Sequence, residues 1–588
     1  MTKPQYEQLQ FHISDLDRIK IPTFQRGIVW NAKAQQDFIQ TLSKGLPFGT
    51  ILVHPSTSDV DSELQLLDGQ QRLSTLKKYK EDSLRYWKPL NRATFDEYYN
   101  TALDLFKDSQ QFKALHDPES YDKDATHNEK QFEDLIKDKE ARQKWVNSLA
   151  RESQRNGVCD VFNDIDKQLK EFVDLDDLIV YALKFTGDEQ LLPTVFENLN
   201  KGGVPLSKYE IFSAAWAHTE IKLAEAGASK LQDRILLKVQ EYYNELADNA
   251  EFELLDYSAD ELNQKRTITL AELGRAVGSY IQEALPALAA GSDKTANELG
   301  FGVLAIAADV DNRQLNSLVD RIDYIKKNLE LILTQIDRIC VSLQKTFDKL
   351  LTVIKSSKTG QYATGITTSF KTLSYFADLW NKETDAEFSA ILKNIPAAYV
   401  YDFLTNSWGS HGDQRLFEYY PDGHRTYAMP ISSDQFMDAY TQWLGDATPG
   451  INFSKDVKAL VTIHANLTYL AHTIPAGINF ELEHITAKKI ITDSSVAKNI
   501  LGGNIGNCMY LPKPDNNKKK YKNLYEVNTH GKYDWLIDNS EYPTREELDS
   551  IVDAIDAKQP DEANTHILHR AEMVGRSLAR HLLHTGPC

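Results

Sequence analysis

The sequence predicts an α+β fold that is predominantly helical and divided into three parts. Short apolar strands alternate with helices near the N-terminus, and one long amphipathic helix occupies the centre. Short strands return in the last third, where aromatic, Gly and Asn residues become more frequent. A chain of 588 residues exceeds the usual size of a single core. We therefore expect domains at residues 1–228, 229–398 and 399–588.

The N-terminal part is expected to be an α/β domain. Asn31 can cap a helix through "AKAQQDFIQTLSKG", which ends near Gly45. "GTILVHPS" and "ELQLLDG" have the composition of apolar strands, and the second leads into a helix from Gln70 to about Lys80. The segment "IPTFQRGIVW", which precedes the first helix, is expected to be extended.

The central part has the most regular hydrophobic period in the chain. Apolar residues spaced by three and four over residues 311–356 predict one long helix with a coiled-coil-like seam. This seam can pack inside a helical domain, or it can form a dimer contact or a rigid connector between functional ends. Its residues are Leu315, Leu318, Ile322, Ile325, Leu329, Ile332, Ile336, Ile339, Leu343, Phe347, Leu350 and Ile354.

Composition narrows the class of protein. The formal net charge is −19, from 66 basic and 85 acidic residues, which argues against indiscriminate binding of nucleic acid but leaves room for a local basic groove. The four cysteines form no C-x-x-C pair, so we expect neither a thiolate zinc site nor a disulfide framework, and a cytoplasmic location fits. Because the N-terminus lacks signal-peptide features and no apolar run is long enough to span a bilayer, no membrane partner is expected.

The stretch "LLDGQQRLSTL" predicts a phosphate-binding site. Gly69 lets the backbone approach a ligand closely, and the helix that starts with Gln70 and Gln71 presents N–H groups and a positive dipole end. Arg72 can clamp a phosphate, and Asp68 can bind Mg²⁺ or a ribose hydroxyl. The alternative is a strand–turn–helix in which Asp68 and Arg72 form a structural ion pair.

Two further N-terminal motifs extend this site. In "PTFQRGIVW", Arg26 can clamp phosphate together with Arg72, and Trp30 can stack on a base. In "FENLNKGGVPLSKYE", Asn200 lies just before a Gly-Gly turn.

A second constellation lies near the C-terminus. Glu483-His484 ends a predicted strand, Asn507 follows 23 residues after His484, and Asn516-Asn517 comes about ten residues later. A metal nuclease of the ββα type needs such a set, with Glu483 and an amide oxygen of Asn516 or Asn517 on Mg²⁺ and His484 as general base. Asn507 can hold the hairpin and orient the histidine ring.

The following lysines predict a DNA contact on an otherwise acidic chain. Within residues 513–522 there are five lysines and one acid, and the proposed backbone contacts are Lys518, Lys519, Lys520 and Lys522. Taken singly, a strand histidine is usually structural and a lysine run is usually a solvated face, so the ordered set carries the prediction.

The three N-terminal motifs together resemble the DGQQR-motif domain of GmrSD-type proteins, which has a ParB- and sulfiredoxin-like fold, over about residues 8–225. This resemblance implies nucleotide binding and hydrolysis. It places Asp68 and Arg72 in catalysis and a second set at the nucleotide, namely Arg26, Trp30, Gly69, Gln70, Gln71 and Asn200.

The C-terminal segment resembles the HNH endonuclease family in the form found at the C-terminus of GmrSD-type enzymes. The family pattern "EHI-x-P … IGNL-x-LL … N" is matched here by "EHITA", "NIGNCMYLP" and "DNN". Ala487 stands where the family usually has Pro, and the third position is Asn rather than His. The resemblance implies a ββα-metal nuclease domain with Asn517 favoured over Asn516.

The two resemblances together imply a type IV, modification-dependent restriction enzyme of bacterial phage defence. We expect a nucleotide-regulated endonuclease that cuts double-stranded foreign DNA carrying modified bases, with Mg²⁺ or Mn²⁺ as cofactor. The sequence leaves GTP, UTP and ATP open as the nucleotide, and a homodimer is plausible because one HNH site cuts one strand. One alternative is a phosphorothioate-sensing nickase and NTPase of the same architecture, and another is a non-catalytic DNA-binding regulatory module.

Overall fold

The computed structural model describes residues 5–20, 30, 32–55, 64–106, 125–147, 149, 151–187, 195, 209, 212, 216, 219–248, 258–351, 362, 366–380, 382, 384–470 and 480–583. The fold is α+β and predominantly helical, as predicted. The chain forms two compact units, unit 1 (Met1–His218 and Tyr242–Glu261) and unit 2 (Thr219–Glu241 and Leu262–Cys588). The predicted boundary at residue 398 lies inside helix α18 (Asp385–Leu404), and unit 2 continues on both sides of it.

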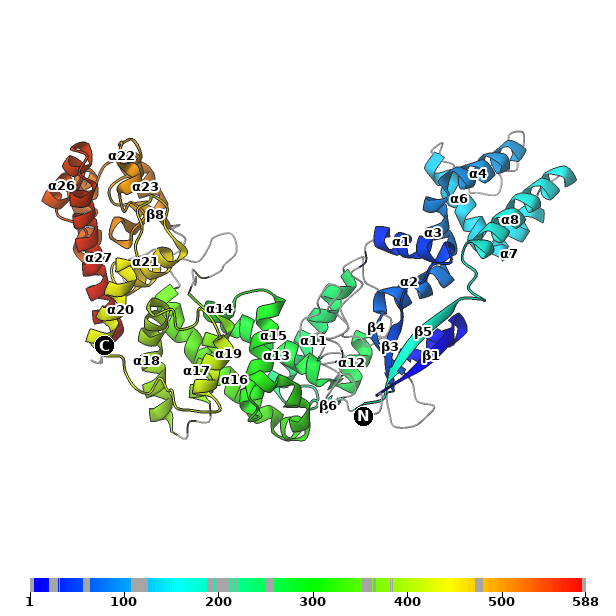
Figure 1. The fold of residues 1–588 in the computed structure, drawn as a ribbon, viewed down its shortest axis with the longest axis horizontal. Coiled ribbons are helices and arrows are strands. Elements are labelled where there is room, and N and C mark those ends of the chain that lie inside the picture. Colours follow the sequence, from blue (N-terminus) through cyan, green and yellow to red (C-terminus); the bar gives the residue numbers. More distant parts are fainter. Residues whose placement is uncertain are drawn as a thin grey trace. The chain divides into compact units, whose positions relative to one another are not determined.

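Unit 1 is built on a mixed sheet of five strands, ordered β1-β5-β3-β4-β2 (Figure 1). β3 lies between β5, to which it is parallel, and β4, to which it is antiparallel. Because β3 is flanked on both sides and covered on both faces, its "ILVH" run is buried throughout, which explains why this strand is continuously apolar. The strands are β1 (Tyr6–His12), β2 (Ile19–Lys20), β3 (Ile51–Pro55), β4 (Leu64–Asp68) and β5 (Ile179–Phe185).

Two helices predicted from the sequence cover this sheet. α1 (Ala32–Ser43) begins directly after Asn31 and ends before Gly45, which has a left-handed φ of +66°. α2 (Gln70–Glu81) starts at the residue predicted. The apolar faces of both helices join one core with the strands. The sheet and these two helices therefore fix the position of the β4–α2 junction.

The rest of unit 1 is a group of helices around a second core, which contains Trp87, Phe95 and Phe162. Charged residues cover its outer faces, so the sequence shows an irregular, highly charged helical pattern in this region. The helices are α3 (Ser83–Leu90), α4 (Arg92–Phe106), α6 (Ala125–Lys137), α7 (Lys139–Asn147) and α8 (Glu152–Phe172).

Unit 2 begins as a helical assembly centred on α16 (Ile322–Leu351). Helices α13, α14, α15, α17, α18 and α21 pack against α16. The elements that lie wholly in this part are β6 (Ile221–Lys222), β7 (Thr267–Ile268), α13 (Leu270–Ala284), α14 (Pro286–Ala289), α15 (Asp293–Ala307), α17 (Ser369–Leu379), α18, α19 (Gly412–Tyr419), α20 (Ser433–Gly445) and α21 (Lys455–Leu467). Two helices, α11 (Lys230–Asp248) and α12 (Ala259–Lys265), belong partly to unit 1 and partly to unit 2.

The predicted helix over residues 311–356 differs from the structure at its start. Residues Asn312–Arg321 form a 3₁₀ segment with a non-helical backbone at Gln314, and α16 begins only at Ile322. Asp311 caps the start of that segment by accepting from the Arg313 backbone N–H, and the non-helical backbone at Gln314 is where regular helical geometry is broken. Residues 352–356 lie outside the described part. From Ile325 to Leu350 the predicted seam is buried inside unit 2, so packing within a helical domain is the alternative that the structure supports.

The C-terminal part of unit 2 contains a hairpin followed by a helix. β8 (Phe480–His484) pairs antiparallel with β9 (Cys508–Pro512), and α23 (Lys513–Lys519) follows β9 directly. Two helices, α26 (Arg545–Asp556) and α27 (Pro560–Leu583), lie side by side, and α27 packs against residues 505–507, which lead into β9 (Figure 1). The shorter helices of this part are α22 (Lys488–Thr492), α24 (Leu524–Val527) and α25 (Asp534–Asn539).

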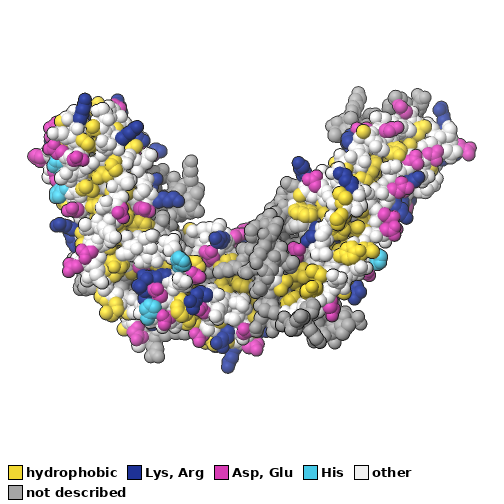
Figure 2. All heavy atoms as spheres, in the orientation of Figure 1, with side chains coloured by type: hydrophobic (Ala, Val, Ile, Leu, Met, Phe, Trp, Pro, Cys, Tyr) yellow, Lys and Arg dark blue, Asp and Glu magenta, His cyan; other side chains and the backbone are white. Residues whose placement is uncertain are grey.

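Acidic and basic side chains are interspersed over the face of each unit seen in Figure 2. None of the helices in the described part of the chain is both long and apolar enough to cross a membrane.

Candidate functional sites

Gly69 shapes the junction between β4 and α2. Its φ is +97°, a left-handed conformation that favours glycine, and a Cβ at this position would lie 2.5 Å from Ile51 Cγ2. α2 therefore begins with a glycine N-cap, and no side chain caps its first turn. A helix start of this kind can bind an anion through its first N–H groups.

Asp68 and Arg72 form an ion pair across this junction. Arg72 Nη2 lies 2.9 Å from Asp68 Oδ2, and Arg72 Nη1 donates to the Phe48 carbonyl at 3.3 Å. This is the structural pair that stood as the alternative to a phosphate clamp. The Arg72 and Asp68 side chains are 21% and 37% exposed, so the pair is accessible, but an incoming anion would compete with Asp68 for the guanidinium.

Trp30 is held beside this junction by its backbone. Its N–H donates to Gln71 Oε1 at 3.1 Å, and its carbonyl accepts from Gln35 Nε2 at 3.1 Å. The half-buried indole packs against Phe38 at 5.2 Å between ring centroids. The structure thus brings Trp30 and Gln71 together, and Gln70 is half-buried on the same helical turn. Two predicted nucleotide contacts, Arg26 and Asn200, lie outside the described residues.

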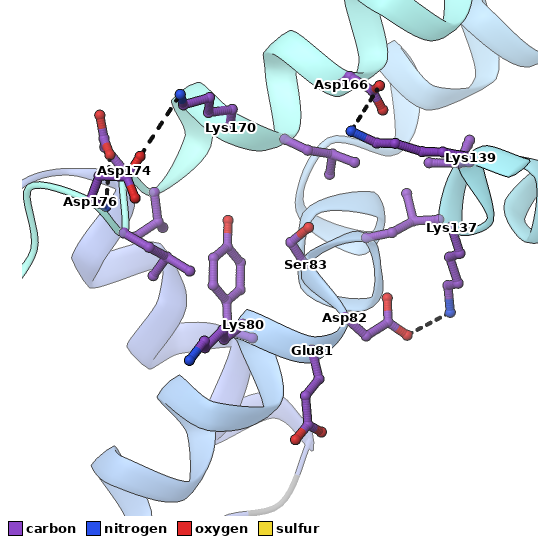
Figure 3. Close-up of a pocket in the computed structure, with 16 residues that line it drawn as sticks. Lys80, Glu81, Asp82, Ser83, Lys137, Lys139, Asp166, Lys170, Asp174 and Asp176 are labelled. Carbon is purple, nitrogen blue, oxygen red and sulfur yellow. Dashed lines mark hydrogen bonds and ion pairs between the residues drawn. The ribbon is translucent and has the colours of Figure 1, made fainter. Parts of the chain in front are cut away.

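A cavity of about 460 Å³ lies at the other end of α2 and was not predicted from the sequence (Figure 3). Its rim carries lysines that pair with acids, such as Lys137 with Asp82 at 2.5 Å and Lys139 with Asp166 at 3.6 Å. Because the lining includes five acids and four lysines, it offers no excess positive charge to a phosphate. Its walls come from three separate segments, which no local motif links.

His484 is the last residue of β8, and two contacts hold its imidazole ring in place. Its Nε2 lies 2.8 Å from the Ile451 carbonyl oxygen, and its ring stacks on Phe453 at 4.1 Å between centroids. A carbonyl oxygen only accepts, so Nε2 carries a proton and Nδ1 keeps the lone pair. Burial lowers the pKa of His484, the contact with Ile451 opposes this, and the positive charges of Lys488 and Lys519 lower it further. The ring is therefore neutral near pH 7, with one nitrogen able to accept a proton.

Asn507 holds the loop that closes the hairpin, as predicted. Its Oδ1 accepts from the Thr486 N–H at 2.7 Å, and its Nδ2 donates to the carbonyls of Thr486 and Gly502. The predicted orientation of the histidine ring by Asn507 is not what the structure shows, because the ring nitrogen Nε2 bonds to Ile451. Asn507 acts on His484 only through the backbone that follows it.

Glu483 is paired with a lysine that the sequence places among the DNA contacts. Lys519 Nζ lies 2.6 Å from Glu483 Oε1 and 3.2 Å from the His484 carbonyl oxygen. The Lys519 side chain is 0% exposed, so the prediction that it contacts DNA is wrong. A buried ammonium needs an acidic partner close by, and Glu483 supplies it. Lys518, Lys520 and Lys522 are exposed, which fits the prediction for them.

The predicted metal ligands do not form a metal site in this arrangement. A divalent cation on Glu483 would lie next to the Lys519 ammonium, and like charges at such distances repel strongly. Asn516 donates to Glu481 Oε2 at 3.3 Å, while Asn517 is exposed. In the described part of the chain, no group of three or more His, Cys, Asp and Glu side chains is placed to hold a metal ion. Glu483 therefore does not fit the role of a Mg²⁺ ligand.

Arg570 of α27 anchors the hairpin from behind. It is buried, and its guanidinium donates to the backbone carbonyls of Ile505, Gly506, Cys508, Ser540 and Glu541. At Gly506 a Cβ would lie 1.9 Å from the Ile567 carbonyl oxygen, so α27 packs directly on this backbone. Sequence reasoning missed Arg570 because its partners lie some 30 and 60 residues away along the chain.

Comparison with known proteins covers the N-terminal part. Residues 8–217 match the family model described as "GmrSD restriction endonuclease, N-terminal domain". An uncharacterized protein of Methanocaldococcus jannaschii is 25% identical over an alignment of 261 residues, and the match covers 37% of this chain and 42% of that protein. The chain thus matches less than half the length of this relative. The family match includes the whole β4–α2 junction, so residues 8–217 of this chain are similar to the N-terminal domain of GmrSD restriction endonucleases.

Proposed function

We propose that this protein is a DNA endonuclease in which His484 is the general base. The observation that carries the proposal is the fixed tautomer of His484: Nε2 is bound to the Ile451 carbonyl, and Nδ1 keeps its lone pair. A pKa lowered by burial keeps this nitrogen unprotonated at neutral pH. The GmrSD-type N-terminal domain supports a restriction function, because it is the domain of a restriction endonuclease family.

The proposed reaction is hydrolysis of a phosphodiester. Nδ1 of His484 takes a proton from water, the water oxygen bonds to phosphorus, and one ester P–O bond breaks. The leaving oxygen takes a proton from solvent, and His484 returns its own proton to solvent, so that one water molecule is consumed for each bond cut. Lys518, Lys520 and Lys522, all exposed and on or just after α23, are the proposed contacts to the DNA backbone. The requirement for Mg²⁺ or Mn²⁺ stays a prediction, and no step here depends on it.

The N-terminal domain is proposed to control this cutting through a bound nucleotide. Support comes from the uncapped first turn of α2 and from the half-exposed Asp68–Arg72 pair, which a phosphate can open. Modified bases in double-stranded foreign DNA are the proposed trigger, in keeping with the motifs at both ends of the chain. The identity of the nucleotide and a homodimeric state stay predictions.

The test is cutting of plasmid DNA by the full chain, with Mg²⁺ and each of GTP, UTP and ATP. His484→Ala should abolish cutting, whereas His566→Ala, a histidine on α27, should leave it unchanged. Activity that survived His484→Ala would remove the nuclease assignment from this site. A panel of unmodified, base-glucosylated and phosphorothioated plasmids then identifies the trigger, and Arg72→Gln should remove the response to nucleotide while His484 remains intact.

A further inference from the structure

We propose that the buried Lys519 ammonium takes the place at Glu483 that a metal ion was predicted to occupy, and that Lys519 is a positioning residue for the His484 base. This inference rests on the proposed function of His484. Lys519 thereby has a different role from the exposed lysines beside it in the sequence.

The Lys519 ammonium contacts two acceptors at the end of β8. Its Nζ donates to Glu483 Oε1 at 2.6 Å and to the His484 carbonyl oxygen at 3.2 Å. The two acceptors are on consecutive residues at the end of β8. The Lys519 ammonium therefore joins the end of α23 to the end of β8. It binds the side chain of Glu483 and the backbone carbonyl of His484, the proposed base.

The ion pair of Lys519 and Glu483 is shielded from water. The Lys519 side chain is 0% exposed and that of Glu483 is 13% exposed, so water does not compete for either charge. Removing one partner of such a pair leaves an uncompensated buried charge, which is strongly destabilising. The pair is thus a permanent part of the folded site, unlike the neighbouring pair of Lys513 and Glu481, whose side chains are 56% and 36% exposed.

The backbone changes direction at the end of α23. Lys520, the residue after Lys519, has a φ of +53°, and α23 ends there. The chain turns away from the hairpin at this point, so Lys519 is the last residue of the helix and lies at β8, while Lys520 is exposed. Lys519 is therefore buried and available for positioning, whereas Lys520 is exposed and available for contact with DNA.

The experiment measures metal binding and cutting separately on the full chain. Mn²⁺ binding is titrated by calorimetry for the wild type, Glu483→Gln and Lys519→Met. We expect Glu483→Gln to change Mn²⁺ affinity by less than about twofold, because the carboxylate belongs to Lys519. A weakening of at least about tenfold, of the size seen when metal-site residues are altered, would overturn the proposal.

Cutting tests the positioning role. Lys519→Met should lower kcat while KM for DNA stays unchanged, because Lys519 touches no DNA. Lys518→Met, the matched exposed neighbour, should raise KM and leave kcat unchanged. If Lys519→Met instead raised KM as Lys518→Met does, Lys519 would be a DNA contact and the proposal would fail.

The double variant separates positioning from a purely structural role. Glu483→Gln with Lys519→Met removes both charges, so the melting temperature should recover most of what each single variant loses. Cutting should stay low in the double variant, because the link from α23 to His484 is still missing. Recovery of cutting along with stability would overturn the positioning role. Failure of the proposed function is distinguishable, because it appears as cutting that persists in His484→Ala.

Discussion

Two acid–base pairs hold the two strand-to-helix junctions that carry the candidate sites, and they differ in their access to water. At the β4–α2 junction, Asp68 and Arg72 are 37% and 21% exposed. At the end of β8, Glu483 and Lys519 are 13% and 0% exposed. An exposed pair contributes little and can open for a ligand, whereas a buried pair cannot be broken cheaply. The first junction is therefore suited to switching and the second to rigid placement.

The largest effect on stability is expected when the basic residue of each pair, Lys519 or Arg72, is replaced. Lys519→Met should destabilise unit 2 by about 3–5 kcal/mol, because it leaves Glu483 buried without its cation. Arg72→Met should cost about 1 kcal/mol or less, since water can solvate Asp68. The measurement is the denaturation midpoint of the full chain in urea, with Lys518→Met as the control for charge removal. Equal losses in both variants would abolish the contrast between the two junctions.

A buried lysine that donates to a carbonyl instead of a carboxylate sharpens the comparison. Lys371 is 1% exposed, and its Nζ donates to the Tyr399 carbonyl at 2.5 Å. Burial lowers its pKa to about 8, against a weaker opposing effect of Asp402. The unfolded chain then binds more protons between pH 8 and 10.5, so stability relative to Lys371→Met should rise with pH, by up to about 3 kcal/mol.

Melting temperatures of the wild type and of Lys371→Met at about pH 7.5 and about pH 9.5, on either side of the lowered pKa, check this prediction. Lys393→Met, on the exposed face of α18, is the matched control and should show a difference that is independent of pH. A pH-independent difference for Lys371→Met as well would show that its burial does not penalise the charged form.

A smaller effect is expected from Gly69, which sets the shape of the exposed junction. Gly69→Ala should destabilise unit 1 by about 1–3 kcal/mol, because its φ is +97° and the added Cβ would meet Ile51 Cγ2 at 2.5 Å. Gly45 also has a positive φ, +66°, but no atom lies within 4 Å of its Cβ position. Gly45→Ala is therefore the control for backbone strain alone, and an equal loss there would remove the role of close packing at Gly69.

The smallest effect on stability is expected from the exposed lysines beside the buried pair. Replacing Lys518, Lys520 and Lys522 by Gln should leave the melting temperature unchanged within about a degree, since surface changes have little effect. If they bind the DNA backbone, the slope of log affinity against log salt should fall by about 0.9 for each phosphate that is no longer neutralised. Fluorescence anisotropy with duplex DNA over a salt series measures this slope. An unchanged slope would place the DNA elsewhere.

Much of the fold near the sites could be predicted because it depends on local signals. α1 ends just before Gly45 and α2 starts just after Gly69, and β8 and β9 are the two short strands that the sequence indicates on either side of a loop. The start of α16 could not be predicted from its seam, because the apolar period continues through the 3₁₀ segment, whose backbone is non-helical at Gln314. A hydrophobic period records which residues face the core, not whether the backbone between them is continuous.

The candidate sites were predictable in their residue types but not in their pairings. His484 and Asn507 lie together as their motif indicates, and Asp68, at the end of β4, pairs with Arg72 in the first turn of α2. By contrast, Lys519 and Glu483 are 36 residues apart, and a run of lysines ordinarily indicates a solvated face. Which lysine of the run is buried depends on where α23 ends, and this is decided by tertiary packing.

The five carbonyl contacts of Arg570 tie the hairpin to a helix that is distant in the sequence. The hairpin and α23 occupy a short stretch of sequence, yet the turn at its centre takes its hydrogen bonds from a guanidinium on the last helix, 62 residues after Cys508. A fragment that ended before α27 would lack these bonds and the close packing on Gly506. The candidate site at β8 and β9 therefore depends on α27, and we expect it to keep its structure in another protein only if α27 is transferred with it.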